Sequence, residues 1–166
     1  LDCGRGHGIL DKLKAQDLIT FTGSAQTGRM LKSMPHIIEQ AIPFNMEADS
    51  LNAAILGEDA APGTPTFDLF IKEVRREMTT KAGQKCTAIR RIIVPEKYLE
   101  DTQIALGKSL AKTTLGDPAQ EGVRMGALVN RSQMDVVRNR VLELAKNTPI
   151  VSGSLDQFDV LGADKS

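Results

Sequence analysis

The alternation of helical apolar periodicity with short apolar runs is the feature that most constrains how this chain can fold. The clearest helical segment covers residues 65–81, where Phe67, Ile71, Val74 and Met78 recur at steps of four, three and four. That spacing puts the four side chains on one face of a helix. Helices that alternate with short strands are typical of an α/β protein with a mainly parallel sheet. The sequence therefore predicts an α/β fold.

The same patterns predict the order of the elements. Short strands are expected at residues 18–21, 41–44, 51–56, 88–94 and 149–152. Further helices are expected at residues 10–15, 25–32, 96–112 and 132–146. Thr64 and Pro65 suit the start of the long helix, as a side-chain cap and a first-turn proline, and Gly83 suits its end. The Gly- and Pro-containing loop at 57–66 marks the expected boundary between domains 1–56 and 57–166.

The charge balance argues against two classes of partner. Lys plus Arg and Asp plus Glu both number 21, so the zero formal net charge gives no reason to expect nucleic acid or an anionic membrane. There is no Trp and only one Tyr to stack on bases. No apolar run approaches the ~20 residues that a membrane-spanning helix needs. We therefore expect neither nucleic acid nor a membrane as a partner.

The two cysteines, Cys3 and Cys86, lie far apart and lack a metal-ligand spacing. We expect no disulfide scaffold and no metal site, and a reducing compartment, the cytoplasm. The chain begins with Leu1 rather than Met, and its first residues do not resemble a signal peptide. We expect it to be a piece of a longer protein.

Three segments carry residues suited to chemistry. In residues 21–28 a strand stops, Gly23 lets the backbone turn and a helix begins, which suits a phosphate, although the spacing alone favours a turn without a ligand. Cys86 follows a helix end beside Lys85, where a cation would favour the thiolate, but a lone cysteine is often a small buried hydrophobe. Glu47 lies near an apolar strand end, either as a buried general base or as an ordinary charge.

Taken in order, these segments resemble the aldehyde dehydrogenase superfamily. Its members have a strand–F-T-G-S-x-x-x-G–helix segment, then a glutamate at a strand end, then G-Q-x-C. Here these are residues 21–28, Glu47 and residues 83–86, with Glu47 and Cys86 a little further apart than is usual. Matches to the family's G-D-P and M-G-P-L segments follow at residues 116–118 and 125–129. The resemblance runs from residue 18 to about residue 137 and implies parts of a Rossmann-type dinucleotide-binding domain (1–56) and of the α/β catalytic domain (57–166).

Most members of the superfamily follow the glutamate with leucine and two glycines, whereas this chain has Ala48, Asp49 and Ser50. These residues, with those at 78–91, are similar to the bifunctional phenylacetic acid degradation family. There, a dehydrogenase domain is fused to a hotdog-type hydratase domain. The hydratase opens the oxepin ring of a CoA thioester, and the dehydrogenase oxidises the resulting semialdehyde with NADP. The resemblance thus implies an aldehyde substrate that is a CoA thioester, NADP or NAD as cofactor, a fused hydratase domain and a homo-oligomeric parent.

The resemblance also implies roles for single residues. Cys86 would be the nucleophile that forms a thiohemiacetal and then a thioester, and Glu47 the general base that activates water. The residues implied to contact the cofactor are Gly23, Ser24, Gly28 and Ala48. The family's oxyanion-hole asparagine and its two ribose-binding residues have no counterpart here, so we expect these 166 residues to be inactive alone.

Other interpretations remain at this point. One is a dehydrogenase for a different aldehyde, because most of a substrate channel would lie elsewhere. A non-catalytic remnant that binds nucleotide or serves assembly is a second alternative, which the presence of both Glu47 and Cys86 argues against. A thiol redox protein is a third, which the lack of a resolving cysteine near Cys86 argues against.

Overall fold

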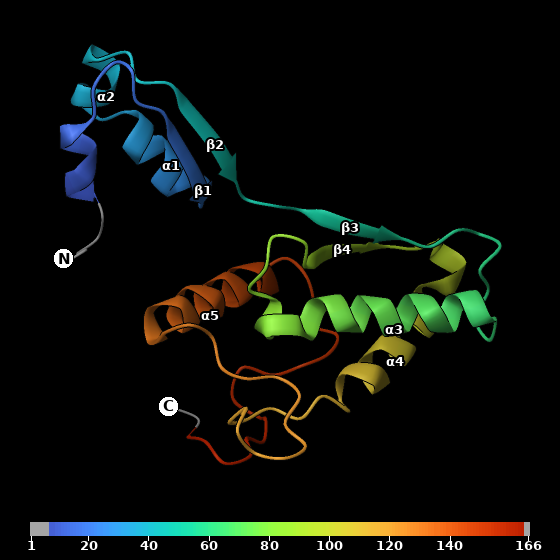
Figure 1. Cartoon of the computed structure of the whole chain (residues 1–166). Helices are drawn as coiled ribbons and strands as arrows, with labels where there is room; N and C mark the ends of the chain where they lie inside the picture. The colour runs from blue at the N-terminus through green and yellow to red at the C-terminus, as the bar shows by residue number, and fades with distance from the viewer. Residues whose placement is uncertain (1–6, 165–166) are drawn as a thin grey trace. The chain divides into compact units, whose positions relative to one another are not determined.

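The computed structural model describes residues 7–164 and divides the chain into two compact units (Figure 1). The first unit ends at Ser50 and the second begins at Leu51. The sequence placed this boundary six residues later, after residue 56. The difference arises because the strand that follows Leu51 pairs with a strand of the second unit rather than the first. Cys3 lies outside the described residues.

The first unit is a parallel pair of strands with its connecting helices. Its elements are η1 (His7–Lys12), β1 (Ile19–Gly23), α1 (Ala25–Lys32), α2 (Pro35–Glu39) and β2 (Phe44–Ala48). β1 and β2 pair in register from Ile19 opposite Phe44 to Gly23 opposite Ala48. A small core of Ile19, Ile37 and Ile42 lies under them. The helix expected at 25–32 is confirmed with the same bounds.

Two expectations for the first unit were wrong, and one element was missed. The helix expected at 10–15 is a 3-10 helix that ends at Lys12, because the next residues form a turn in which Lys14 N–H donates to the Asp17 carboxylate at 2.7 Å. The strand expected at 41–44 begins only at Phe44, because Ala41 has a φ of 51°, which interrupts extended backbone. The short helix α2, which begins at Pro35, was not anticipated.

The second unit packs helices against another parallel pair of strands. Its elements are β3 (Asn52–Ile55), α3 (Pro65–Thr79), η2 (Thr80–Gly83), β4 (Ile89–Ile93), η3 (Glu96–Tyr98), α4 (Leu99–Leu110) and α5 (Arg131–Ala145). α3 lies along the β3–β4 pair and packs on α4 (Figure 1). The parallel pairing in both units confirms the expected fold class.

α3 is built as its sequence predicts. Thr64 Oγ1 accepts a hydrogen bond from Phe67 N–H at 3.3 Å, which caps the start of the helix. Pro65 occupies the first turn, where its lack of a backbone N–H costs no hydrogen bond. Phe67, Ile71 and Val74 are buried, and Met78 packs against the same core. This face therefore anchors the second unit.

The end of α3 and the end of the chain depart from expectation. α3 ends at Thr79, and η2 follows with left-handed backbone at Lys81 and Ala82 (φ 53° and 54°) before Gly83 (φ 73°). The helix expected at 96–112 is split into η3 and α4. Residues 149–152 do not form the expected strand, because they pair with no other strand in the described part of the chain.

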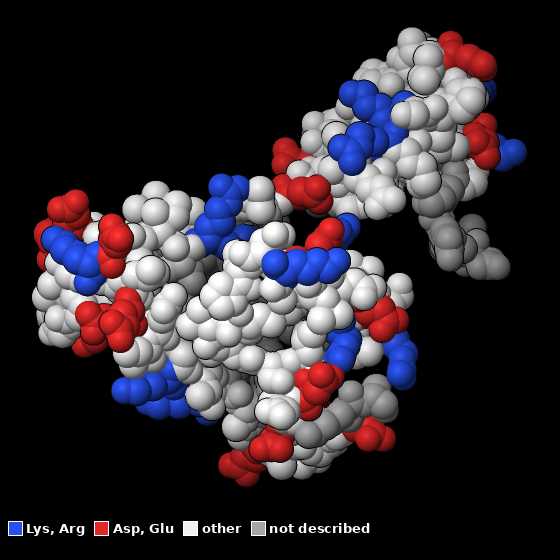
Figure 2. Space-filling view, turned by 180° about the vertical axis from the view of Figure 1, so that it is seen from behind, with Lys and Arg blue, Asp and Glu red and all other residues white. Residues whose placement is uncertain are grey.

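The surface of the described residues carries both signs of charge. Figure 2 shows acidic and basic side chains interspersed on the visible face of each unit. Within residues 7–164, no helix combines the length and the apolar character that crossing a bilayer requires.

Val74 offers a test of this core, since it is only 1% exposed. Val74→Ala should lower the free energy of unfolding by about 2 kcal/mol, because two buried methyl groups are lost and a cavity remains. Val136→Ala on α5, where the valine is 49% exposed, is the matched control and should change stability by less than about 0.5 kcal/mol. Chemical denaturation of the protein over its full natural length measures both, and equal effects would contradict the assignment of the core.

Candidate active site

The turn between β1 and α1 is shaped by a serine cap and a buried glycine. Ser24 caps α1, since its Oγ accepts a hydrogen bond from Thr27 N–H at 3.1 Å. Gly28 is buried, and a Cβ on it would overlap Met46 Sδ and lie 3.1 Å from Phe21 Cε1. Glycine at this position therefore allows α1 to pack closely on β1 and β2.

Asp49 closes the same turn from β2. Its backbone has a φ of 50°, and its N–H donates to Gly23 O at 3.3 Å. Its Oδ1 accepts from Ala25 N–H, the first residue of α1, at 3.2 Å. One of the free N–H groups at the helix start is thus already satisfied by a carboxylate.

The carboxyl ends of β1 and β2 bring the expected cofactor residues together. Gly23 lies opposite Ala48, and Thr22 lies opposite Glu47. Gly23 and Ser24 are exposed and Ala48 is half-buried, so backbone at the helix start is open to a phosphate. This arrangement fits the diphosphate part of a dinucleotide. The negatively charged carboxylate of Asp49 would lie near that diphosphate, because it is bonded to Ala25 N–H at the same helix start.

Glu47 differs from its expected setting. The sequence placed it between two strands, but it lies on β2 itself, and its side chain is exposed, whereas the interpretation as a general base expected a buried one. The reason is the later start of β2, which moves the strand onto residues 44–48.

Cys86 lies at the corner of a closed turn before β4. Ala88 N–H donates to Lys85 O at 3.2 Å, which leaves Cys86 and Thr87 as the two central residues. Cys86 is exposed and has a free thiol, whereas Ala88 is fully buried. The interpretation of Cys86 as a small buried hydrophobe is therefore wrong.

Two amide side chains hold the backbone around this turn. Asn52, the first residue of β3, donates through Nδ2 to Cys86 O at 2.5 Å and to Ala88 O at 3.2 Å. Before the turn, Gln84 donates through Nε2 to Lys81 O at 3.0 Å, and its Oε1 accepts from Val129 N–H at 2.8 Å. Both sides of the turn are thus tied to segments far away in the sequence.

Lys85 is held by an ion pair. Its Nζ lies 2.6 Å from the Glu77 carboxylate on α3, and both side chains are about four-fifths buried. The hydrogen bond from Lys85, followed by its charge and by Arg76, lowers the pKa of Glu77 despite the opposing effect of burial. The expectation of Lys85 as a free cation beside Cys86 is not supported, because its ammonium is engaged by Glu77.

The sequence did not single out Asn52 or Glu77. Asn52 is 34 residues from Cys86, so no local pattern links the two. Glu77 belongs to a run of charges on α3 that resembles an ordinary solvated helix face. Only the packing of the end of α3 against the Cys86 turn distinguishes Glu77 from its neighbours.

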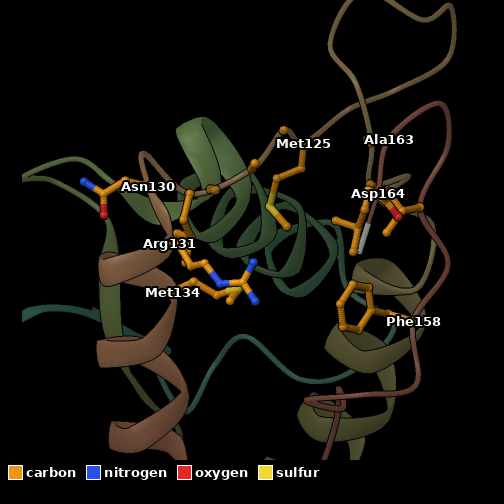
Figure 3. A pocket seen from close by; sticks show the side chains of 14 residues that line it. Met125, Asn130, Arg131, Met134, Phe158, Ala163 and Asp164 are labelled. Carbon is orange, nitrogen blue, oxygen red and sulfur yellow. The ribbon is translucent and has the colours of Figure 1, made fainter. Parts of the chain in front are cut away.

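The two later motif segments also meet. Gly116 N–H donates to Met125 O at 3.1 Å, and a Cβ on Gly126 would lie 2.9 Å from Pro118 Cγ. Beside them is a largely apolar cavity of about 470 Å³, where Met125, Met134 and Phe158 face one another around Arg131 (Figure 3). Cys86 does not line this cavity.

The chain matches the model of the aldehyde dehydrogenase family over residues 3–159. The chain belongs to this family. It is 42% identical over 162 residues to 3,4-dehydroadipyl-CoA semialdehyde dehydrogenase of Aromatoleum evansii. The alignment covers 98% of this chain and 32% of that protein. The family expected from the sequence motifs is thereby confirmed.

Solved structures show the same fold. An oxidoreductase from Marinobacter aquaeolei aligns with a TM-score of 0.74 at 25% identity, over 90% of this chain and 30% of that one. Betaine aldehyde dehydrogenase from Staphylococcus aureus, solved in complex with NAD+, aligns with a TM-score of 0.71 at 23% identity, over 85% of this chain and 26% of that one. The chain therefore spans less than a third of the length of these relatives.

The Glu77–Lys85 pair predicts a pH-dependent contribution to stability. A glutamate whose pKa is lower in the folded state than in the unfolded state stabilises the folded state at pH values above the ordinary glutamate pKa. This contribution disappears as the pH falls through the lowered pKa. Glu77→Gln should therefore lower the unfolding temperature at pH 7 and differ progressively less from wild type in acid.

Thermal unfolding from pH 7 down to pH 3 measures this difference. Glu100→Gln, which changes an exposed glutamate in the first turn of α4, is the control. A deficit for Glu77→Gln that stays constant down to the lowest pH would show that the ion pair is not its cause.

Proposed function

We propose that this chain is part of an NAD(P)-dependent aldehyde dehydrogenase in which Cys86 is the nucleophile and Glu47 is the general base. The observation that carries the proposal is the exposed Cys86 thiol at the corner of a turn with a held backbone, in a chain of this family. The dinucleotide-binding domain, expected at residues 1–56, would then end at residue 50, and the catalytic domain, expected at 57–166, would begin at residue 51, because β3 pairs within the second unit.

The proposed chemistry begins at Cys86. Its thiolate adds to the aldehyde carbon, so that a C–S bond forms and the carbonyl oxygen becomes an oxyanion, which the Cys86 N–H stabilises. A bound nicotinamide would accept the hydride from that carbon, and a thioester then remains on Cys86. Glu47 takes a proton from water, whose oxygen adds to the thioester as the C–S bond breaks, which releases a carboxylic acid and the thiolate.

The residues proposed to hold the cofactor lie at the carboxyl ends of β1 and β2. Gly23 and Ser24 would approach the diphosphate, with Gly28 allowing α1 to pack closely beneath it. Ala48, opposite Gly23 in the register, would lie toward the nicotinamide. We propose NADP from the motif resemblance, with NAD as the alternative that the NAD+ complex of betaine aldehyde dehydrogenase supports.

The proposed substrate is the semialdehyde of a CoA thioester. The name of the 42% identical relative describes this substrate class, as does the motif resemblance to phenylacetic acid degradation proteins. We further propose a homo-oligomeric parent with a fused hydratase domain. The free thiol that the chemistry needs favours a reducing compartment, the cytoplasm.

Single-turnover reduction of NADP by the protein over its full natural length tests both roles, with an aliphatic aldehyde as substrate. Wild type should give a burst of NADPH and Cys86→Ala none, since no thiohemiacetal forms. Glu47→Gln should give the burst but turn over at least about 100-fold more slowly, because water attacks the thioester without a base. NADPH formation by Cys86→Ala would refute the nucleophile assignment.

A polypeptide of these 166 residues alone should show no steady-state aldehyde oxidation. The reason is that the family's oxyanion-hole asparagine and ribose-binding residues have no counterpart in its sequence. A coupled NADPH assay on the purified polypeptide measures this, with the full-length protein as positive control. Turnover above the Cys86→Ala background would overturn the expectation.

A further inference from the structure

The side chain of Asn52 holds the Cys86 turn from β3. An asparagine amide nitrogen carries two hydrogens, and here Nδ2 donates to Cys86 O at 2.5 Å and to Ala88 O at 3.2 Å. Asn52 is half-buried and lies opposite Ile89 in the β3–β4 pairing. A single side chain thus links the nucleophile's own carbonyl to the carbonyl that immediately precedes β4.

These two bonds fix backbone that other contacts leave unfixed. The Lys85–Glu77 ion pair and the two bonds of Gln84 act on residues before Cys86. The bond from Ala88 N–H to Lys85 O closes the turn but does not set the plane of the peptide between Cys86 and Thr87. Since a peptide unit is planar, a bond to Cys86 O orients that whole unit.

We propose that Asn52 is a positioning residue that sets the orientation of the Cys86 nucleophile. The inference rests on the proposed function, because it assigns Asn52 to the reaction of Cys86. Asn52 touches neither substrate nor cofactor in this role, and it acts through the Cys86 backbone. A thiolate held in one orientation reaches the aldehyde carbon in a near-attack geometry. A displacement of the reacting group by about 1 Å can lower the rate about 100-fold.

Asn52→Asp is the sharpest variant, because an ionised carboxylate has the same shape but no hydrogen to donate. It also places negative oxygen against two carbonyl oxygens. Asn52→Ala removes the donors without adding charge and is measured in parallel. Asn147→Asp is the matched control, since Asn147 is exposed in the turn after α5 and has no side-chain hydrogen bond in the described part of the chain.

The experiment is single-turnover NADPH formation with saturating aliphatic aldehyde, using the protein over its full natural length. The amplitude of the burst counts folded sites with a competent thiol, and its rate constant reports the chemistry at each site. Asn52→Asp and Asn52→Ala should keep a wild-type amplitude and lose about 100-fold in the rate constant. Their KM for the cofactor should stay at the wild-type value, and Asn147→Asp should match wild type throughout.

The outcomes distinguish a positioning role from a structural one. A reduced amplitude with an unchanged rate constant for both Asn52 variants would show a merely structural role and overturn the proposal. Rate constants within about threefold of wild type at full amplitude would overturn it as well. If Cys86→Ala still gives a burst, the proposed function fails and the positioning role fails with it. If Cys86→Ala abolishes the burst, the proposed function stands, and the rate constants of the Asn52 variants decide the positioning role.

Discussion

The parallel pairing of β3 with β4 is the interaction on which the Cys86 site depends. Parallel strands cannot be joined by a tight hairpin, so the chain must cross over between them, here through α3. The amino ends of both strands then lie at one edge, which brings Asn52 beside the turn that leads into β4. The buried face of α3, with Val74 at its centre, holds this crossover in place. The exposed Cys86 thiol is therefore presented by a turn that the parallel strand pair and its crossover helix hold in place.

In the first unit, the residues proposed for the site lie at the carboxyl ends of a separate parallel strand pair rather than at the amino ends. β1 and β2 are also parallel, and the helices α1 and α2 form their crossover, so their carboxyl ends meet. Gly23, Ala48 and Glu47 are gathered there, which is the edge where ligands bind in open α/β sheets. Asp49 adds a carboxylate at the start of α1 and couples the end of β2 to the turn after β1. The motif that this chain resembles has glycine at this position, whereas here Asp49 carries a charge and also closes the backbone.

Local sequence patterns predicted most elements but not their partners. The bounds of α1 and the capped start of α3 were predicted closely, because caps and apolar periodicity act over a few residues. The strand expected at 149–152 failed, since an apolar run becomes a strand only where a neighbour pairs with it. β2 began later than expected because the left-handed Ala41 is not signalled by residue type. The residues proposed for the site were picked out only through the order of their motifs along the chain.

The sequence by itself determined the α/β class, the helices with a strong apolar face, and the family to which Cys86, Glu47 and the 21–28 turn point. Tertiary structure alone decided which side chains support them. Asn52 meets Cys86 across 34 residues, and Gln84 meets Val129 across 45. Glu77 takes up the ammonium of Lys85 because the end of α3 packs against the turn. Periodicity and capping depend on near neighbours, whereas these contacts depend on strand pairing and on the path of the crossover helix, which no local pattern encodes.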